Sequence, residues 1–190
     1  MSIAIIPARG GSTRIPRKNI RPFHGKPIIC YSIETAIAAG FDVVVVSTDD
    51  DEIARIAVDA GASVQWRSSE LCKDEVGTQE VMKEILLGLG RSRKEIACCI
   101  YPCAPLLDVR SIDMAMDIFN WRDMDYVFSV SPTQSMKFVD AGQFYLGNVK
   151  SFIEERPLIQ SRVALVITDT IDINTPEDWE KAEKMYESRK

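Results

Sequence analysis

Histidine and an excess of positive charge are what this sequence lacks most clearly. Only His24 is present, and 23 basic residues face 28 acidic ones, which gives a formal net charge of −5. Proteins that bind duplex nucleic acid usually carry a basic footprint, so we expect no nucleic-acid partner. A single imidazole also argues against a zinc site, because the five cysteines show no metal-ligand spacing. In a reducing compartment these thiols are expected to behave as buried small hydrophobes.

Long apolar runs are missing as well. No run reaches the roughly 20 residues that a helix needs to cross a bilayer, and the run at residues 3–6 is too short for the apolar core of a secretory signal. We therefore expect a cytoplasmic protein with no membrane partner. The composition, with 46% hydrophobic and 27% charged residues, is that of an ordinary globular protein. A chain of 190 residues suffices for one domain with its own core.

Two alternating hydrophobic patterns predict the fold class. Continuous β-branched or apolar runs, typical of strands covered on both faces, occupy residues 3–7, 42–47, 96–100, 126–130 and 163–167, with shorter extended runs at 63–66 and 143–146. Helical spacing is found in residues 27–39, 50–61, 78–87, 111–119 and 176–186. Strands that alternate with helices imply an α/β fold, in which a mostly parallel sheet lies between two helical layers in a three-layer, Rossmann-like arrangement.

Single residues give further local predictions. Asp50, Ser111 and Thr175 are expected to cap the helices that begin after them, and Gly40 is expected to end the helix that precedes it. The tryptophans at positions 66, 121 and 179 are expected in the core or on helix faces.

A basic, glycine-rich loop, PARGGSTRIPRKN at residues 7–19, follows the first predicted strand. Gly10 and Gly11 permit a close backbone approach, and their N–H groups, with that of Ser12, could cradle phosphate oxygens. Four cations, Arg9, Arg14, Arg17 and Lys18, would suit a triphosphate. The spacing matches neither a Walker A loop nor the GxGxxG dinucleotide pattern. The alternative is a solvated basic loop that merely follows a strand.

This loop resembles the signature of the cytidylyltransferases that activate sialic-type acids. Further motifs of that family follow in order: GKP, VVVSTDDDEIA, WRSSEL, IYPCAPLL, DYVFSV, DAGQFY and IDINTPEDWEKAE. DAGQFY and the terminal PEDW motif are most similar to the pseudaminic acid cytidylyltransferase branch. The resemblance implies a nucleotidyltransferase fold in a single domain over residues 1–190. It also implies an enzyme that transfers CMP from CTP to a nine-carbon 2-keto sugar acid and releases pyrophosphate.

The resemblance implies roles for particular residues. Arg9, Lys18 and Asp172 would be catalytic, with Arg9 on the phosphates and Lys18 at the α-phosphate. The residues implied to bind CTP are Pro7, Ala8, Arg9, Gly10, Gly11, Ser12, Asn19, Arg67, Pro102 and Cys103, of which the last three stand where the family holds the cytosine. Those implied to bind the sugar are Asp140, Gln143 and Tyr145. The alternatives are a surface charge at Arg67, a strand-end filler at Cys103, and a strand edge with an outward Gln143 and a packed Tyr145.

Asp172 and Asn174 stand where the family carries its metal-binding Asp-Ile-Asp, which implies Mg²⁺ as cofactor. Alternate residues of a strand point to one face, so both side chains could converge on one ion. An amide supplies an oxygen without charge, so the affinity for Mg²⁺ should be lower unless Asp49 or Asp169 contributes. Alternatively, both residues only lead into the cap at Thr175.

Two departures from the family pattern leave alternatives open. Thr13 replaces the usual Lys and is similar to the related KDO cytidylyltransferases. The family's long excursion before DAGQFY is reduced here to residues 131–139. We therefore expect a monomer or a homodimer without an exchanged arm. The rival functions are a cytidylyltransferase for KDO or legionaminic acid, and a nucleotide-binding relative that has lost turnover.

Overall fold

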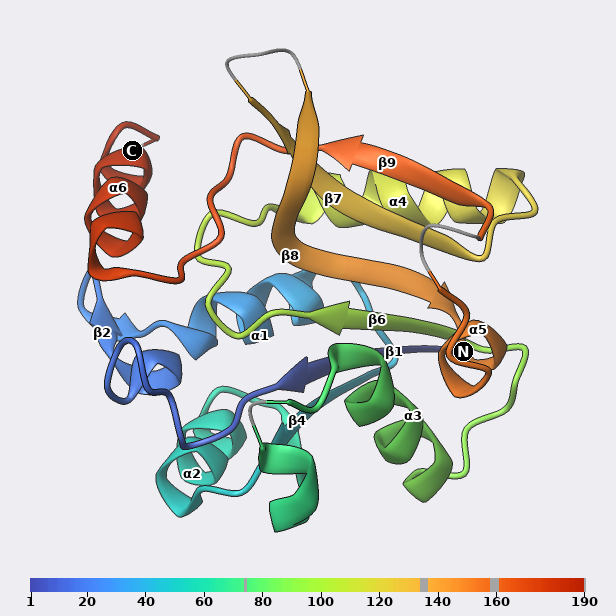
Figure 1. Ribbon diagram of the computed structural model, residues 1–190, viewed down its shortest axis with the longest axis horizontal. Coiled ribbons are helices and arrows are strands. Elements are labelled where there is room, and N and C mark those ends of the chain that lie inside the picture. The colour runs from blue at the N-terminus through green and yellow to red at the C-terminus, as the bar shows by residue number, and fades with distance from the viewer. Residues whose placement is uncertain (74, 134–136, 158–160, 190) are drawn as a thin grey trace.

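The computed structural model describes residues 1–73, 75–133, 137–157 and 161–189. Its centre is a seven-stranded sheet in the order β5-β4-β1-β6-β8-β7-β9 (Figure 1). The strands are β1 (Ser2–Pro7), β4 (Val43–Thr48), β5 (Ser63–Trp66), β6 (Ile96–Ile100), β7 (Tyr126–Pro132), β8 (Phe138–Asn148) and β9 (Val163–Ile167). All neighbours in this sheet pair in parallel except for β8, which runs antiparallel to both β6 and β7. The predicted mostly parallel sheet is confirmed.

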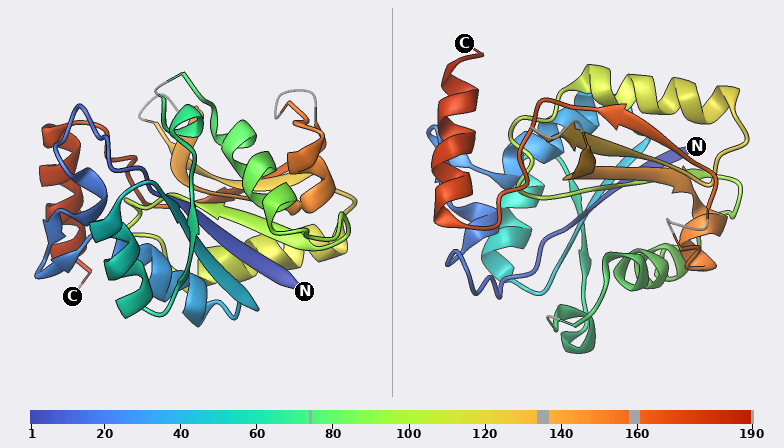
Figure 2. Two further views of the ribbon diagram at one scale, coloured as in Figure 1. Left: turned by 90° about the horizontal axis from the view of Figure 1, so that it is seen from below. Right: turned by 45° about the horizontal axis from the view of Figure 1, so that its top comes forward.

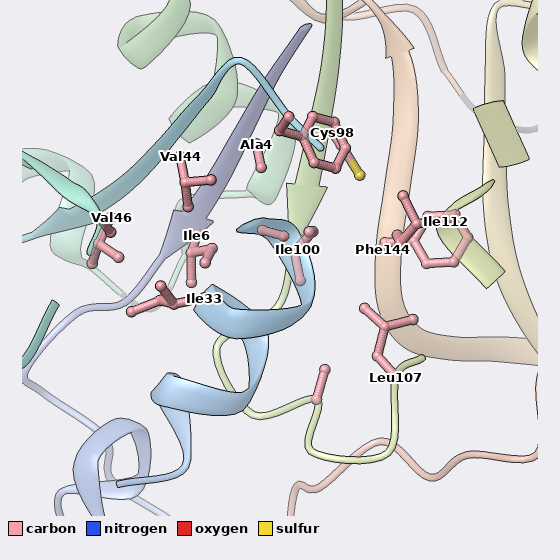
Figure 3. Packing of buried hydrophobic residues seen from close by; sticks show 14 of the residues in the cluster. Ala4, Ile6, Ile33, Val44, Val46, Cys98, Ile100, Leu107, Ile112 and Phe144 are labelled. Carbon is pink, nitrogen blue, oxygen red and sulfur yellow. The ribbon is translucent and has the colours of Figure 1, made fainter. Parts of the chain in front are cut away.

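Helices cover both faces of the sheet, as the views in Figure 2 show. On one face lie α1 (Ile29–Ala38), α2 (Asp51–Asp59) and α4 (Val109–Trp121). On the other lie α3 (Thr78–Gly88) and α5 (Val149–Ile153). Alternate residues of β1 divide between the two cores: Ala4 and Ile6 pack with the first group, and Ile3 and Ile5 with the second. The three-layer arrangement is confirmed, and Figure 3 shows Ile33 against the side of β1 that carries Ile6.

A smaller core lies at one end of the sheet. The hairpin of β2 (Pro22–Phe23) and β3 (Lys26–Pro27) packs against α6 (Pro176–Glu187). The Phe23 ring lies 5.6 Å from the Trp179 ring, centroid to centroid, in an edge-on arrangement. Cys103 and Ile173 belong to the same cluster. It therefore joins α6 to the segments that follow β6 and β9.

Two of the three predicted caps are confirmed. The Asp50 carboxylate accepts hydrogen bonds from the N–H groups of Glu52 and Ile53, and Thr175 forms a capping box with Asp178. The prediction at Ser111 is wrong, because α4 begins earlier and is capped by Asp108, which accepts from the Ser111 N–H. Both Asp108 and Ser111 are good cap residues, and the sequence alone favoured the wrong one.

Other local predictions differ from the structure. Trp66 and Trp121 are 59% and 88% exposed, so only Trp179 is a core tryptophan. The run predicted at 143–146 is part of the longer strand β8, and α5 carries no clear sequence signal. Cys98, Cys99 and Cys103 are buried as expected, but the cysteines at positions 30 and 72 are only half-buried. None of the helices in the described ranges combines the length and apolar character needed to cross a bilayer.

Candidate functional site

A cavity of about 530 Å³ opens where β1 and β6 end. Because these neighbouring strands are parallel, their carboxyl ends meet at one edge of the sheet, which is where ligands bind in open α/β sheets. The described residues that line the cavity are Pro7, Arg9, Ser12, Thr13, Arg14, Lys18, Asn19, Arg67, Leu71, Lys73, Val76, Thr78, Val81, Tyr101, Pro102, Cys103 and Asp172. The loops after β1 and β6 therefore share one cavity. The sequence also predicts the loop after Ser47 at this cleft, but none of the described lining residues comes from it.

The cavity lining is strongly cationic. Among its described residues are five cations, at positions 9, 14, 18, 67 and 73, and one carboxylate, Asp172. This excess of positive charge stands out in a chain whose net charge is −5. Positive side chains gathered in a concave site raise the local concentration of anionic ligands. The arrangement suits a polyphosphate.

The basic loop is held in place by the residues that follow β4. The Gly10 N–H donates to the Asp49 carboxylate at 2.8 Å, and the Ser12 N–H donates to the Gly10 carbonyl at 3.1 Å. A Cβ atom on Gly10 would lie 2.7 Å from Oδ2 of Asp50, whereas one on Gly11 would meet nothing within 4 Å. Two of the three predicted phosphate-facing N–H groups are therefore engaged within the protein. A close approach to Asp50, rather than to a ligand, explains the glycine at position 10.

Arg17 does not line the cavity, contrary to the expectation that its charge faces a triphosphate. Its guanidinium forms ion pairs with Asp50 and Glu52 at the start of α2. Its backbone is left-handed, with φ of 54°, which turns the chain into the 3-10 helix at Lys18–Ile20. Arg17 thus anchors the loop to α2.

Replacing Asp50 by alanine is expected to lower the free energy of unfolding at pH 7 by about 1–2 kcal/mol, since the helix cap is lost. The Arg17 guanidinium, together with the Ile53 N–H, holds the pKa of Asp50 below its ordinary value despite partial burial. A lowered folded-state pKa contributes stability that is present above the ordinary pKa of about 4 and is lost as the pH falls through the lowered value. The difference between Asp50→Ala and the wild type should therefore shrink below pH 4.

Urea denaturation at pH 7 and at pH 3 measures this difference. Asp50→Asn, which keeps a capping oxygen but not the charge that pairs with Arg17, should lie between the wild type and Asp50→Ala at pH 7. An Asp50→Ala deficit of the same size at both pH values would contradict the assignment.

Asn19 and Cys103 connect the basic loop to the end of β6. The amide nitrogen of Asn19 donates to the Arg9 carbonyl at 2.8 Å, and Sγ of Cys103 lies 3.3 Å from Oδ1 of Asn19. Burial raises the pKa of Cys103 to about 12, so the group is a neutral thiol that can donate to the amide. In this structure Cys103 contacts Asn19. A contact between Cys103 and cytosine stays a prediction.

Arg67 follows β5 and is not a surface charge. Its guanidinium donates to the Ser47 carbonyl at 3.0 Å and to the Ser47 hydroxyl at 3.3 Å, and burial lowers its pKa. Beside it, Arg9 donates to the Cys72 carbonyl at 2.8 Å. Both guanidinium groups are therefore fixed by backbone contacts while they line the cavity.

Asp172 lies in the segment between β9 and α6. Residues 168–175 of this segment form no strand, so the expected alternation of Asp172 and Asn174 along a strand is wrong. The two side chains nevertheless meet, because Nδ2 of Asn174 donates to Oδ2 of Asp172 at 2.5 Å. Lys18 joins this segment to the basic loop by donating to the Ile173 carbonyl at 2.7 Å. Burial raises the pKa of Asp172, against the opposing effects of Asn174 and Lys18.

Asp49 and Asp169, the other two carboxylates suggested as metal ligands, form no direct contact with Asp172 among the described residues. Asp169 is 92% exposed and faces Arg189 at 3.7 Å, and Asp49 holds the Gly10 N–H. The residues that the structure describes contain no group of three His, Cys, Asp or Glu side chains that could hold a metal by themselves. Asp172 is therefore the one carboxylate among the described residues that line the cavity, and the Asn174 amide nitrogen contacts it.

The three residues predicted to bind the sugar do not line the cavity in the described structure. Gln143 is 1% exposed, so the alternative of an outward side chain is wrong; its amide nitrogen donates to the carbonyls of Ala141 and Ile171. Asp140 accepts from the Tyr145 hydroxyl and, at 2.9 Å, from the Gly142 N–H. The Tyr145 ring lies 6.0 Å from that of Tyr101, centroid to centroid. Binding of a sugar by these residues stays a prediction.

Several lining residues were not singled out as binding residues from the sequence. Tyr101 precedes Pro102 directly, and its hydroxyl forms a 2.9 Å hydrogen bond with the Thr78 hydroxyl at the start of α3. Proximity to Pro102 and Cys103 could have identified Tyr101. Lys73 lies in the chain between β5 and α3, and Thr78 is the first residue of α3; no motif marks either of them.

Comparison with known proteins agrees with this geometry. Residues 3–141 match the family model described as cytidylyltransferase. Pseudaminic acid cytidylyltransferase of Campylobacter jejuni subsp. jejuni serotype O:23/36 (strain 81-176) is 31% identical, with 97% of this chain and 96% of that protein covered. CMP-N,N′-diacetyllegionaminic acid synthase of Legionella pneumophila subsp. pneumophila (strain Philadelphia 1) is 30% identical, with the same coverage of both chains.

A solved structure shows the same fold. The structure of CMP:2-keto-3-deoxy-manno-octonic acid synthetase complexed with CTP matches with a TM-score of 0.79 at 16% identity, covering 100% of this chain and 99% of that one. The alignment with the Campylobacter protein spans 222 positions, whereas 97% of this chain is about 184 residues. About 38 positions of that alignment therefore have no counterpart in this chain. The family resemblance seen in the sequence is confirmed: the chain belongs to the cytidylyltransferase family.

Proposed function

We propose that this chain transfers CMP from CTP to a nine-carbon 2-keto sugar acid of the pseudaminic or sialic type and releases pyrophosphate. The observation that carries the proposal is the cationic cavity at the carboxyl ends of β1 and β6, with Asp172 as the one carboxylate among its described lining residues. Relatives covered over nearly their full length act, by their names, on pseudaminic and legionaminic acids. A cytoplasmic location goes with this proposal.

In the proposed reaction, the anomeric hydroxyl of the sugar acid attacks the α-phosphorus of CTP. Arg9 binds phosphate oxygens, and Arg67, with Pro102 and Cys103, contacts the cytosine, so that the nucleotide is held in line with the attacking group. Lys18 faces the α-phosphate and stabilises the negative charge that develops there. Because Cys72 and Ser47 carbonyls already fix the two guanidinium groups, little side-chain rearrangement accompanies binding.

The residues around Asp172 fit a magnesium ion that arrives with the nucleotide. Mg²⁺ is usually held by one or two carboxylates together with substrate phosphates and water, and here Asp172 offers a carboxylate beside the amide of Asn174. Asp172 and the Asn174 oxygen would hold the ion. When bound, Mg²⁺ supplies charge neutralisation on the phosphates. Burial, which raises the pKa of Asp172, disfavours an unpaired carboxylate at this place, and a bound cation would offset that cost.

The sugar acid is the open part of this proposal. The Campylobacter and Legionella proteins are 31% and 30% identical to this chain, so identity does not separate a pseudaminic from a legionaminic substrate. The test is an assay with CTP, Mg²⁺ and a panel of pseudaminic, sialic, legionaminic and KDO acids, in which pyrophosphate release and the CMP-sugar are both measured. We expect turnover with a nine-carbon acid. Binding of CTP without pyrophosphate from any acid would overturn the proposal in favour of a nucleotide-binding protein without turnover.

We expect the chain to be a monomer, or a homodimer without an exchanged arm. Of residues 131–139, positions 134–136 lie outside the described residues, and on either side of them Ser131 pairs with Val139 and Pro132 with Phe138. Only five residues separate Pro132 from Phe138 in the sequence, too few to wrap a neighbouring subunit. The roughly 38 alignment positions absent from this chain are consistent with a shortened excursion.

Light scattering during size-exclusion chromatography tests this expectation. The predicted result is the mass of one chain of 21.3 kDa, or a dimer that dissociates on dilution. A stable dimer in which the β7–β8 hairpin inserts into its partner would contradict it.

A further inference from the structure

Residues of the DAGQFY motif do not themselves line the described cavity, but Gly142 and Gln143 contact the segment that carries Asp172. We infer that Gly142 is a positioning residue for Asp172: its missing side chain provides the space in which the Asp172 carboxylate sits. The inference rests on the proposed role of Asp172 in nucleotidyl transfer, and assigns to the motif a function separate from binding the sugar.

The space between Gly142 and Asp172 leaves no room for a side chain at position 142. A Cβ atom at this position would lie 2.6 Å from Cγ of Asp172 and 2.9 Å from each of its carboxylate oxygens. Such distances are well inside van der Waals contact, so any side chain at position 142 would displace the carboxylate. Gly142 also has a φ of +58°, which a residue with a side chain adopts only at a cost. The left-handed turn and the close contact thus both require glycine.

Neighbouring side chains fix the same turn and the same segment. Oδ1 of Asp140 accepts the Gly142 N–H at 2.9 Å, which closes the turn. The Gln143 amide donates to the Ala141 carbonyl at 2.6 Å and to the Ile171 carbonyl at 3.2 Å, which ties the turn to the residue before Asp172. Because Gln143 is buried, this link is shielded from water.

The Asp172 segment depends on such links. Thr168 still donates its N–H to the Val130 carbonyl of β7 at 2.8 Å, but no backbone bond to a strand follows over the described residues 169–174. The Ser131 hydroxyl bonds to the carbonyls of Thr168 and Thr170 at 3.2 and 3.0 Å. Lys18 adds a further contact, to the Ile173 carbonyl. The segment is therefore held mainly by side chains of other elements, and not by a ladder of backbone hydrogen bonds as in a strand. A displacement of the carboxylate by about 1 Å is enough to cost on the order of 10²-fold in rate.

The test variant is Gly142→Ala. We expect kcat to fall on the order of 10²-fold, with a higher Mg²⁺ concentration for half-maximal rate. Calorimetric titration of CTP should show that the gain in affinity from Mg²⁺, relative to EDTA, is reduced, while the affinity in EDTA is unchanged. Gly40→Ala is the matched control, because Gly40 has a φ of +74° and nothing within 4 Å of an added Cβ. Gly40→Ala therefore places alanine in a left-handed backbone conformation, as Gly142→Ala does, but its Cβ atom meets no neighbouring group.

A double-mutant cycle with Asp172→Ala separates two effects of Gly142→Ala on stability: the contact of the added Cβ with the Asp172 carboxylate, and the backbone strain. Removing the carboxylate opens the space, so Gly142→Ala should lower the thermal midpoint less in the Asp172→Ala background than in the wild type. If Gly142→Ala alone fails to fold, recovery of folding in the double variant supports the inference. Equal losses of thermal stability in both backgrounds would overturn it, as would an unchanged Mg²⁺ response in a folded Gly142→Ala. If Asp172→Ala itself leaves the Mg²⁺ response intact, the role proposed for Asp172 fails, whatever the stability cycle shows.

Discussion

Replacing Lys18 by methionine is expected to lower kcat by about 10²–10³-fold, the loss typical of removing one group that stabilises charge in a transition state. Lys18 lines the cavity and is held by the Ile173 carbonyl, so its ammonium group is already positioned beside Asp172. Methionine keeps most of the unbranched side chain but removes the charge and, with it, the hydrogen bond to the Ile173 carbonyl. The effect should appear mainly in kcat, because the charge on the α-phosphate grows as the bond to pyrophosphate breaks.

Steady-state rates of pyrophosphate release measure this effect. Lys94→Met is the matched control, since Lys94 is exposed and precedes β6 at the opposite end of that strand from the cavity. Thermal midpoints of both variants establish that the fold is retained. A Lys18→Met enzyme with the wild-type kcat would exclude the proposed role of Lys18.

Asp172→Asn is expected to have an effect of similar size, about 10²–10³-fold in kcat, with a large rise in the Mg²⁺ requirement. The change keeps the shape of the side chain and removes the one carboxylate among the described residues that line the cavity. Asp169→Asn is the control, because Asp169 is exposed and pairs with Arg189. It should leave both kcat and the Mg²⁺ dependence near their wild-type values.

The reverse change, Asn174→Asp, should lower the Mg²⁺ concentration needed for half-maximal rate. It places a second carboxylate next to Asp172 and removes the hydrogen bond between the two side chains. Without metal, the two like charges repel, so the thermal midpoint should fall in EDTA and recover on addition of Mg²⁺. If the Mg²⁺ dependence is the same in Asp172→Asn, Asn174→Asp and the wild type, the metal is bound elsewhere.

Much of the fold could be predicted because its strands carry their own signal. The runs at residues 43–46 and 96–100 are β-branched or apolar throughout, since parallel strands are covered on both faces. β8 was only partly predicted. Its glycines at positions 142 and 147 interrupt the hydrophobic pattern, and its antiparallel direction depends on pairing with β6 and β7, which no local pattern encodes.

The location of the candidate site could be predicted in part, because it lies where parallel strands end. The basic loop and the Tyr101–Cys103 turn were placed correctly because parallel strands end at a common edge. The sequence could not show which charges are already paired. Arg17 looks equivalent to Arg9 and Arg14 within the loop, yet Asp50 and Glu52, which lie more than 30 residues along the chain, hold it away from the cavity. The buried position of Gln143 similarly depends on a long-range contact with Ile171.

Binding of CTP at the cationic cavity is the central claim, and calorimetric titration of Mg²⁺ and CTP into the wild type and Arg9→Ala tests it most directly. Arg110→Ala serves as control, because Arg110 is exposed on α4 and does not line the cavity. We expect one CTP per chain, with an affinity about 10–100-fold weaker in Arg9→Ala, as for the loss of a hydrogen bond to a charged group. Arg110→Ala should bind as the wild type does. No CTP binding by the wild type, or equal affinities of the wild type and Arg9→Ala, would contradict the account.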